Sequence, residues 1–257
     1  MKQFEKGIDR VTVTGSPVIG KSLFLAYFFT QYCTQNPTAT VIVASFTTGV
    51  MDEVLVWTHE QMEHANEQKE AMLELIQRAE AKAKDEGRPF IRLYDGLPSQ
   101  LPPRSRVMCC ANACHAMHDK ERADPRQVTL YMPVWDSDEL TGGEEVLYLH
   151  MEPPPVDFEI AEERFNTFGG IARVCLSDNE EYVKQTEARL LRTIERISNR
   201  AVMVHYALNA ENTDWAEVLG GTSIYVPEEG NPLKFTTESP STYIRHLAVE
   251  RMMERGF

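Results

Sequence analysis

The sequence predicts an α/β fold with a mainly parallel five-stranded sheet, followed by a small helical lid and a C-terminal α+β tail. Two observations predict the sheet and its helices. Short runs rich in β-branched residues alternate with helix-forming stretches, a pattern typical of a parallel sheet with helices on both faces. A glycine-rich loop joins the first of these runs to the first helical stretch. The composition then changes at three consecutive prolines, residues 153–155, which indicates a stiff break before the lid.

Five apolar runs are expected to form the strands of this sheet. They are residues 11–14, 40–46, 90–95, 106–112 and 128–133. A helix is expected at 22–35, and a second, long one over 52–86, which is rich in Glu, Gln, Ala and Lys. Because that stretch has few bulky apolar residues in its second half, we expect a solvated surface helix there.

We expect three segments along the 257 residues: a core at 1–152, a helical lid at 153–200 and an α+β segment at 201–257. In the lid, a short helix at 157–166 should stop at the glycine pair 169–170, before an amphipathic helix at 179–200. Apolar residues of the second helix share one side, namely Val183, Leu190, Leu191, Ile194 and Ile197. In the tail we expect strands at 202–208 and 222–226 and a helix at 242–255.

The glycine-rich loop reads GSPVIGKS at residues 15–22, a complete phosphate-binding signature at a strand-to-helix junction. Backbone N–H groups of the loop and of the helix start would converge on phosphate oxygens. Lys21 would contact the β- and γ-phosphates, and the Ser22 hydroxyl would bind Mg²⁺. Since Pro17 has no N–H, the donors come mainly from Val18 onward. The predicted nucleotide-binding residues are Gly15, Ser16, Pro17, Val18, Ile19, Gly20, Lys21, Ser22 and Leu23. The alternative is a glycine-rich turn that binds nothing.

Two strand-end polar residues are candidates for the rest of this site. Asp95 ends the third run, where an Asp would hold Mg²⁺ through water opposite Ser22; it could instead cap the Asp95-Gly96 turn. One strand-like run lies between the loop and Asp95, which suits the class of P-loop proteins in which these two strands are not neighbours. Asn112, at the end of the next run, is either a sensor of the γ-phosphate or water, or an ordinary strand-end residue.

The carboxylate that would activate water is missing from its usual place. Many ATPases of this class have a Glu directly after the metal-binding Asp, but this chain has Gly96. Either another carboxylate serves or turnover is slow. The candidates are Asp52, Glu53, Asp136 and Glu139.

Charge and composition argue against several other classes. The net charge of −13, from 39 acidic and 26 basic residues, disfavours general binding of nucleic acid through its phosphates. No apolar run reaches the roughly 18 residues of a membrane span. The first six residues show no apolar core of a signal peptide, so any secretion leader is expected to lie outside this sequence.

The cysteines and histidines do not form a convincing metal motif. Cys109 and Cys110 are adjacent in an expected strand and should point to opposite faces, and no C-x-x-C pair occurs. The cluster continues to Cys114, His115 and His118, and we interpret its cysteines as buried thiols of the core. Free thiols of this kind are typical of a reducing compartment. His59 and His64 are five residues apart, which would separate them by about 140° around a helix.

Four motifs together resemble the NTPase region of the crinkler effectors of oomycetes and of chytrid or mycorrhizal fungi, a region shared with the trypanosome retrotransposon hot spot proteins. They are GSPVIGKSLF at 15–24, LYDG at 93–96, YMPVWDSDEL at 131–140 and ERFNTFGGIARVCL at 163–176. Their order and spacing match that region over about two-thirds of the chain. The first motif is generic, whereas the third and fourth are specific.

The resemblance implies a P-loop ATPase distantly similar to the AAA+ and STAND groups. Lys21, Ser22 and Asp95 would then form the ATP–Mg²⁺ site, and Arg173, in the GGIAR run of the lid, would sense the γ-phosphate. Such proteins are secreted into a host and often act in its nucleus, which implies a host protein partner. Many carry a restriction-type nuclease domain, but the Glu-x-Lys runs here, at 67–69 and 80–82, both lie inside the helix expected at 52–86. Nuclease activity is therefore not expected.

Two departures from the family pattern matter. Val18 stands where the family often has Gly, which affects the geometry of the loop. We expect no N-terminal translocation module within these 257 residues, because the LFLA run at 23–26 that is similar to its motif is expected to belong to the loop helix.

The sequence thus predicts Mg²⁺-dependent ATP binding and hydrolysis in a nucleotide-driven regulatory module. The alternatives are a small-molecule or nucleotide kinase and a non-hydrolysing interaction module. Adenine is preferred over guanine because the Asn-Lys-x-Asp pattern of GTPases is absent. Arg164 lies where the lid could bring a positive charge to the phosphates, but it is expected to be a solvated surface residue. A homo-oligomer could supply an arginine in trans, from a group flanking the fourth strand: Arg104, Arg106, Arg122 and Arg126.

Overall fold

A computed structural model describes residues 2–59, 61–66, 68–102, 105–111, 124–141, 156–196 and 224–256. The chain divides into two compact units. The first unit consists of Met1–Thr14 and Lys21–Leu130, and the second of Gly15–Gly20 and Tyr131–Phe257. The predicted segment boundaries at residues 152 and 200 remain predictions.

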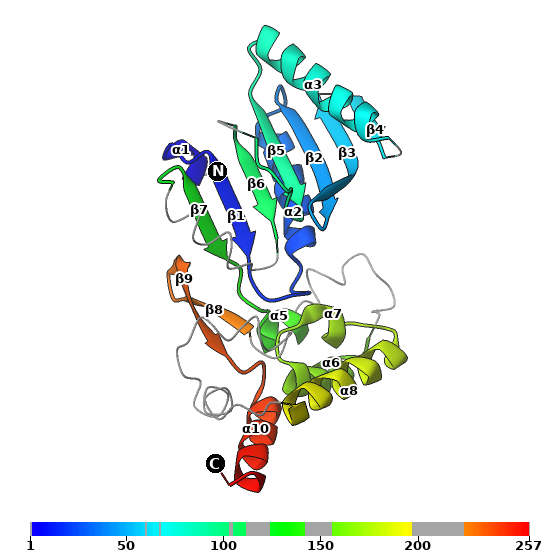
Figure 1. The fold of residues 1–257 in the computed structure, drawn as a ribbon, viewed down its shortest axis with the longest axis vertical. Helices are drawn as coiled ribbons and strands as arrows, with labels where there is room; N and C mark the ends of the chain where they lie inside the picture. Colours follow the sequence, from blue (N-terminus) through cyan, green and yellow to red (C-terminus); the bar gives the residue numbers. More distant parts are fainter. Residues whose placement is uncertain are drawn as a thin grey trace. The chain divides into compact units, whose positions relative to one another are not determined.

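A seven-stranded sheet has the order β4-β3-β2-β5-β6-β1-β7 (Figure 1). Its strands are β1 (Arg10–Thr14), β2 (Thr40–Thr47), β3 (Val50–Thr58), β4 (Gln61–Ala65), β5 (Phe90–Asp95), β6 (Val107–Cys110) and β7 (Gln127–Tyr131). Four central strands, β2, β5, β6 and β1, pair in parallel, whereas β3 and β4 add antiparallel at one edge. The α/β class and the mostly parallel sheet are confirmed, but the predicted number of five strands is wrong.

The two extra strands, β3 and β4, occupy the first part of the stretch expected to be one long helix. Val54 and Val56 alternate inward along β3 and are buried, because β-branched side chains fit a half-buried pleated surface. A two-residue turn precedes β3, with Thr48 at φ 50° and Gly49 at φ 84°, the conformation that favours a hairpin. The prediction of a helix from residue 52 was therefore wrong.

Helices cover both faces of the sheet (Figure 1). On one face, α2 (Lys21–Gln35) packs against β5 and β6. On the other, α3 (Lys69–Asp85) lies over β2, β3 and β4. The expected solvated helix is α3, but one of its faces is buried in the core, through Met72, Leu75, Ile76, Ala79 and Ala83. Before the sheet, α1 (Lys2–Glu5) is a single turn.

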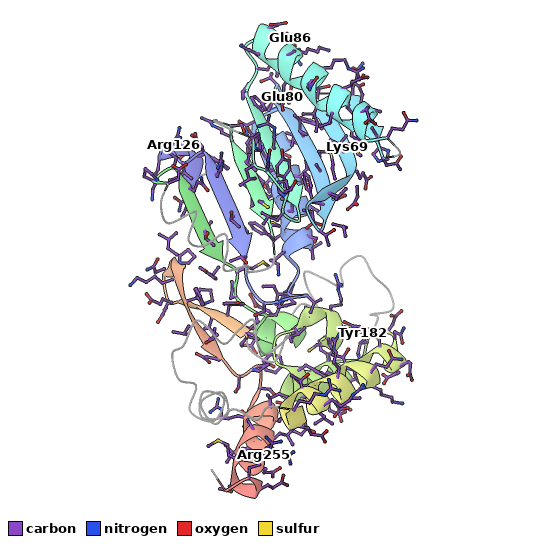
Figure 2. The ribbon with its side chains drawn as sticks, in the orientation of Figure 1. Lys69, Glu80, Glu86, Arg126, Tyr182 and Arg255 are labelled. Carbon is purple, nitrogen blue, oxygen red and sulfur yellow. The ribbon has the colours of Figure 1, made fainter. Side chains whose placement is uncertain are left out.

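The Glu-x-Lys run at 80–82 lies on α3, in a helix as expected. Its Glu80, labelled in Figure 2, forms an ion pair with the buried Arg92 of β5. The Nε of Arg92 donates to Glu80 Oε1 at 2.9 Å. This carboxylate therefore holds α3 to the sheet and has a structural role.

In the part that the structure describes, the second unit contains five helices and a hairpin. Its helices are α5 (Ser137–Thr141), α6 (Phe158–Phe168), α7 (Ala172–Cys175), α8 (Glu180–Arg196) and α10 (Thr242–Glu254). Leu140, Phe168, Val183 and Ile244 belong to its buried core. The helices predicted at 157–166, 179–200 and 242–255 correspond to α6, α8 and α10, with residues 197–200 outside the described ranges.

An antiparallel hairpin of β8 (Ile224–Glu228) and β9 (Asn231–Glu238) lies in the tail. It packs on Tyr131, whose ring centroid is 4.1 Å from that of Phe235 and 6.1 Å from that of Tyr225. The strand predicted at 222–226 corresponds to β8, while β9 was not predicted. The strand predicted at 202–208 lies outside the described residues.

Arg164 is buried, not solvated as expected. Its guanidinium donates to the carbonyl oxygens of Cys175, at 3.3 Å, and Ser177, at 2.6 Å, and pairs with Glu180. It therefore satisfies carbonyl groups at the end of α7 and fixes the start of α8. Among the helices in the described ranges, none is long and apolar enough to cross a membrane.

Candidate functional site

The P-loop motif divides between the two units, with Lys21 and Ser22 in the first and Gly15–Gly20 in the second. In the first unit, Lys21 begins α2 and Asp95 ends β5. Strand β6 lies between β1 and β5, which confirms that the loop strand and the Asp95 strand are not neighbours. Because carboxyl ends of parallel strands meet at one sheet edge, Asp95 lies at the edge where ligands bind in open α/β sheets.

Ser22 and Asp95 are brought together as the sequence predicted. The Ser22 hydroxyl donates to Asp95 Oδ1 at 3.0 Å, although 73 residues separate them. Ser22 is exposed and therefore accessible to a ligand. Lys21 is buried, with 8% of its surface exposed. Burial lowers the pKa of Lys21 to about 8, against smaller raising effects from Cys110 and Asp95.

The adjacent cysteines of β6 face opposite sides of the sheet, as predicted. Cys110 lies near Lys21 and Asp95, and burial together with the Asp95 charge raises the pKa of its thiol to about 12. Cys109 belongs to the core under α3, and its thiol donates to the carbonyl oxygen of Gly96 at 3.0 Å. The rest of the expected cluster, Cys114, His115 and His118, lies outside the described residues.

The backbone at Gly96 has no room for a side chain. Its φ is 89°, in the region that favours glycine, and an added Cβ would lie 2.2 Å from the carbonyl oxygen of Phe46. Its N–H donates to the carbonyl oxygen of Cys110 at 2.8 Å. The fold therefore excludes a water-activating Glu directly after Asp95.

A cavity of about 310 Å³ opens beside the Ser22–Asp95 pair, within the first unit. Its polar lining comes from Ser22, Asp95, Ser45 and Glu53. The apolar lining comes from α2, β2, β3 and β4, through Leu25, Ala26, Phe29, Val43, Ala44, Leu55 and Met62. Asp52 is not among the described residues that line it, so Glu53 is the candidate carboxylate that this cavity selects.

Glu53 is paired with His64 across the β3–β4 hairpin. The Nε2 atom of His64 lies 2.6 Å from Oε1 of Glu53. The helical separation expected between His59 and His64 does not apply, because His64 lies in β4 and His59 lies in the turn before it, at φ 23°. The sequence does not predict this pair, because the pair depends on the register of the unpredicted β3–β4 hairpin.

The loop itself, Gly15–Gly20, belongs to the second unit. Three of its residues have positive φ: Gly15 at 149°, Val18 at 58° and Gly20 at 100°. Positive φ is a genuine outlier for a β-branched residue. Val18 therefore has the left-handed backbone conformation that glycine adopts easily.

Contacts with the rest of the second unit hold the loop in place. The indole Nε1–H of Trp135 donates to the carbonyl oxygen of Ile19 at 2.7 Å. The hydroxyl of Ser16 accepts the backbone N–H of Tyr225 at 2.9 Å. At Gly15 an added Cβ would lie 2.6 Å from the carbonyl oxygen of Met132. The YMPVWDSDEL motif therefore supports the loop.

The same motif contacts the glycine pair of the fourth motif. The backbone N–H of Trp135 donates to Gly170 at 3.2 Å, and an added Cβ at Gly170 would lie 1.8 Å from the Trp135 carbonyl oxygen. Asp136 and Glu139 bond to each other around the start of α5: each side chain accepts the other's backbone N–H, at 2.7 and 3.0 Å. This capping box gives both carboxylates a structural role.

A second cavity, of about 320 Å³, lies wholly within the second unit, beside loop residues Ser16, Pro17 and Val18. Helix α8 contributes Tyr182 (Figure 2), Thr186, Arg189, Leu190 and Thr193. The other walls are Phe168, Ile171, Val174, Ile224 and Pro240. Arg189 was missed by the sequence analysis, although its spacing of three from Thr186 and seven from Tyr182 places all three on one helix face.

Several predicted residues stand apart from these features. Arg173 is exposed on α7 and is not among the described residues that line the second cavity. Leu23 is 59% exposed on α2. Asn112, Arg104 and Arg122 lie outside the described residues.

The remaining two arginines proposed to act in trans are exposed. Arg106 directly precedes β6, at the sheet edge opposite Asp95. The backbone carbonyl of Arg126 accepts the N–H groups of Asp9 and of Arg10, the first residue of β1, and its side chain pairs with Asp9 at 3.3 Å. Neither lies at the active edge where we expected this group. Comparison of the chain with protein-family models and with curated proteins finds no match.

Proposed function

We propose that this protein binds ATP with Mg²⁺ and hydrolyses it. The observation that carries the proposal is the 3.0 Å bond between Ser22 and Asp95, beside the buried Lys21 at the start of α2. A loop signature alone can occur by chance, but here the hydroxyl and the carboxylate expected to serve Mg²⁺ meet from distant parts of the chain.

The donor set suits a hard cation. Mg²⁺ prefers oxygen ligands and is usually held by one or two carboxylates or hydroxyls together with water and phosphate. Ser22 and Asp95 would hold the ion in this way. When bound, Mg²⁺ would neutralise charge on the β- and γ-phosphates.

The loop and its lysine suit a polyphosphate. Positive φ at Gly15, Val18 and Gly20 supports a tightly wound loop whose N–H groups can converge on an anion. With a pKa of about 8, Lys21 is still mostly protonated at pH 7.

The resemblance to crinkler effectors extends this proposal to regulation. In this proposal the nucleotide state changes the lid helices and so controls a host protein partner or a second copy of the chain, in the host nucleus. The contacts of Trp135 with both Ile19 and Gly170 support it, because they connect the loop directly to the glycine pair that precedes α7.

A second candidate function is nucleotide binding without hydrolysis. Gly96 favours it, because this position cannot carry the usual water-activating carboxylate. Phosphate release by the purified protein separates the two functions. Stoichiometric retention of ATP, with no phosphate released, would support the second.

The test of nucleotide binding is calorimetry on Lys21→Ala. Loss of a charge-assisted phosphate contact should weaken ATP binding by about 1.5–3 kcal/mol, roughly 10- to 150-fold. Lys69→Ala is the matched control, because Lys69 is exposed on α3 (Figure 2) and should leave the affinity unchanged. Equal affinity of wild type and Lys21→Ala would overturn the assignment. Displacement of ATP by an equal concentration of GTP would overturn the preference for adenine.

A further inference from the structure

We propose that Glu53 is the general base that activates the attacking water, and that His64 is its positioning residue. This inference rests on the proposed ATPase function and supplies the carboxylate that Gly96 cannot. Three observations carry it: the register of three strands, a shared cavity and the hydrogen bond from His64.

The register places Glu53 on the same sheet face as Asp95. Ser45 of β2 is the partner of Asp95 in β5 and also the partner of Glu53 in β3. Directly paired residues point to the same face, and neighbouring strands lie about 4.8 Å apart. The backbones at Glu53 and Asp95 are therefore separated by two strand spacings, about 10 Å.

The first cavity fills that separation. Ser22, Ser45, Glu53 and Asp95 all line it. A general base acts on water that lies between it and the reacting phosphate, not on the metal ligands themselves. The distance between Glu53 and Asp95 therefore leaves room for a water molecule that Glu53 could activate. Asp95 and Ser22 would hold Mg²⁺ at the other end of the cavity.

The three other candidate carboxylates either cap a helix or lie at an irregular position of β3. Asp136 and Glu139 cap α5 through each other's backbone N–H groups. Asp52 falls at an irregularity of register, where Phe46 pairs with Met51 and Ser45 with Glu53, so that Asp52 has no partner residue in β2.

The surroundings of Glu53 suit a base. Its side chain is 52% exposed and that of His64 is 42% exposed, so water reaches both. His64 Nε2, 2.6 Å from Glu53 Oε1, can donate its proton to that oxygen and hold the carboxylate in one rotamer. The second oxygen of Glu53 remains available to accept a proton from water.

The reaction balances with ATP and water alone. The water oxygen bonds to the γ-phosphorus while one water proton passes to the Glu53 carboxylate. The bond from the γ-phosphorus to the β–γ bridging oxygen breaks, and its electron pair leaves with ADP. Glu53 then releases its proton to solvent, so the products are ADP, phosphate and one proton.

The experiment compares phosphate release and ATP affinity of the full chain. Glu53→Gln removes the base but keeps its size, so kcat should fall at least about 100-fold, as for loss of general base catalysis, while the Kd for ATP stays within about threefold. Glu63→Gln is the matched control. It lies in the same hairpin, where Glu63 pairs with the exposed Arg78, and should hydrolyse ATP at the wild-type rate.

Two substitutions at His64 test its positioning role. His64→Ala should lower kcat about five- to twentyfold with the KM for ATP unchanged. His64→Gln restores an N–H donor and should recover most of that loss. A purely structural role would instead change stability and KM together, with no rescue by Gln, and would overturn the role of His64.

The outcomes separate this inference from the proposed function. Absence of ATP binding in the wild type would overturn both. ATP binding without phosphate release in the wild type would overturn Glu53 as a base but leave nucleotide binding standing. Phosphate release at equal rates by wild type and Glu53→Gln would overturn only the inference, and the same loss in Glu63→Gln would also count against it.

Discussion

The indole Nε1–H of Trp135 donates a 2.7 Å hydrogen bond to the carbonyl oxygen of Ile19, 116 residues earlier in the chain. The backbone N–H of the same Trp135 donates to Gly170. Trp135 thus contacts both the glycine-rich loop at 15–20 and the glycine pair before α7. Through Trp135, the segments 15–24, 131–140 and 163–176 are therefore in contact with one another.

Trp135→Phe should loosen the loop. The substitution keeps an aromatic ring but removes the donor, so the Ile19 carbonyl loses its partner at a cost of about 1–3 kcal/mol. We expect a lower free energy of unfolding and weaker ATP binding, measured by urea denaturation and calorimetry. Trp57→Phe is the control, since Trp57 makes an edge contact with Phe29 that another ring can keep. Equal effects of the two substitutions would contradict the role of the hydrogen bond.

Val18→Gly should not weaken the protein, although Val to Gly is normally destabilising. Left-handed backbone costs a non-glycine residue about 1–2 kcal/mol, and glycine loses about 0.5–1 kcal/mol through its flexibility. The free energy of unfolding should therefore stay constant or rise by up to about 1.5 kcal/mol. Val50→Gly, at an exposed strand position without positive φ, should lower it. If Val18→Gly lowered the free energy of unfolding as much as Val50→Gly, the loop backbone at Val18 would not be strained.

The sequence predicted the central strands well because parallel strands buried on both faces are short continuous apolar runs. Residues 90–95 are an example, since prediction and β5 coincide. The hairpin was missed because the polar residues around Val54 and Val56 resemble a helical surface until their partners in β2 are known. The fold class was thus predictable, but the strand number depended on long-range pairing.

The candidate site divides in the same way. Lys21, Ser22 and Asp95 were predictable, because each follows a local motif at an element boundary. The Glu53–His64 pair and the contact of Trp135 with Ile19 were not, since both depend on which distant segments meet. Arg164 was assigned to the surface because a charged residue on a short helix usually lies there. Its burial depends on carbonyl groups of α7 that only the fold brings near.

The four described cysteines should react slowly with alkylating reagents in the native protein. Burial raises the pKa of Cys33 to about 11 and those of Cys110 and Cys175 to about 12, from an ordinary 9.0. Because only the thiolate reacts, at pH 8 this lowers the reactive fraction about 100-fold for Cys33 and about 1,000-fold for the other two. The rates should rise with pH up to these values.

Mass spectrometry after timed exposure to iodoacetamide measures each of these sites, with urea-unfolded protein as the control for intrinsic reactivity. Cys109, which is buried and donates to Gly96, should also be protected. Native alkylation of Cys110 as fast as in urea would contradict the buried, neutral thiol beside Lys21.

Among the glycines in the described ranges, Gly96 is one of those where a change to Ala should be most damaging. The added Cβ would meet the Phe46 carbonyl at 2.2 Å on a backbone with φ 89°, so β5 and β2 must separate where the Ser22–Asp95 pair lies. We expect the free energy of unfolding to fall by about 3 kcal/mol or more. Gly87→Ala is the matched control, because Gly87 has a φ of 65° with nothing within 4 Å of its added Cβ. Gly87→Ala should lower the free energy of unfolding by about 1 kcal/mol only, the cost of positive φ for a non-glycine residue. Urea denaturation measures the free energy of unfolding of both variants. Equal losses of this free energy would mean that position 96 tolerates a side chain. In that case the fold would not require the water-activating carboxylate to come from another position.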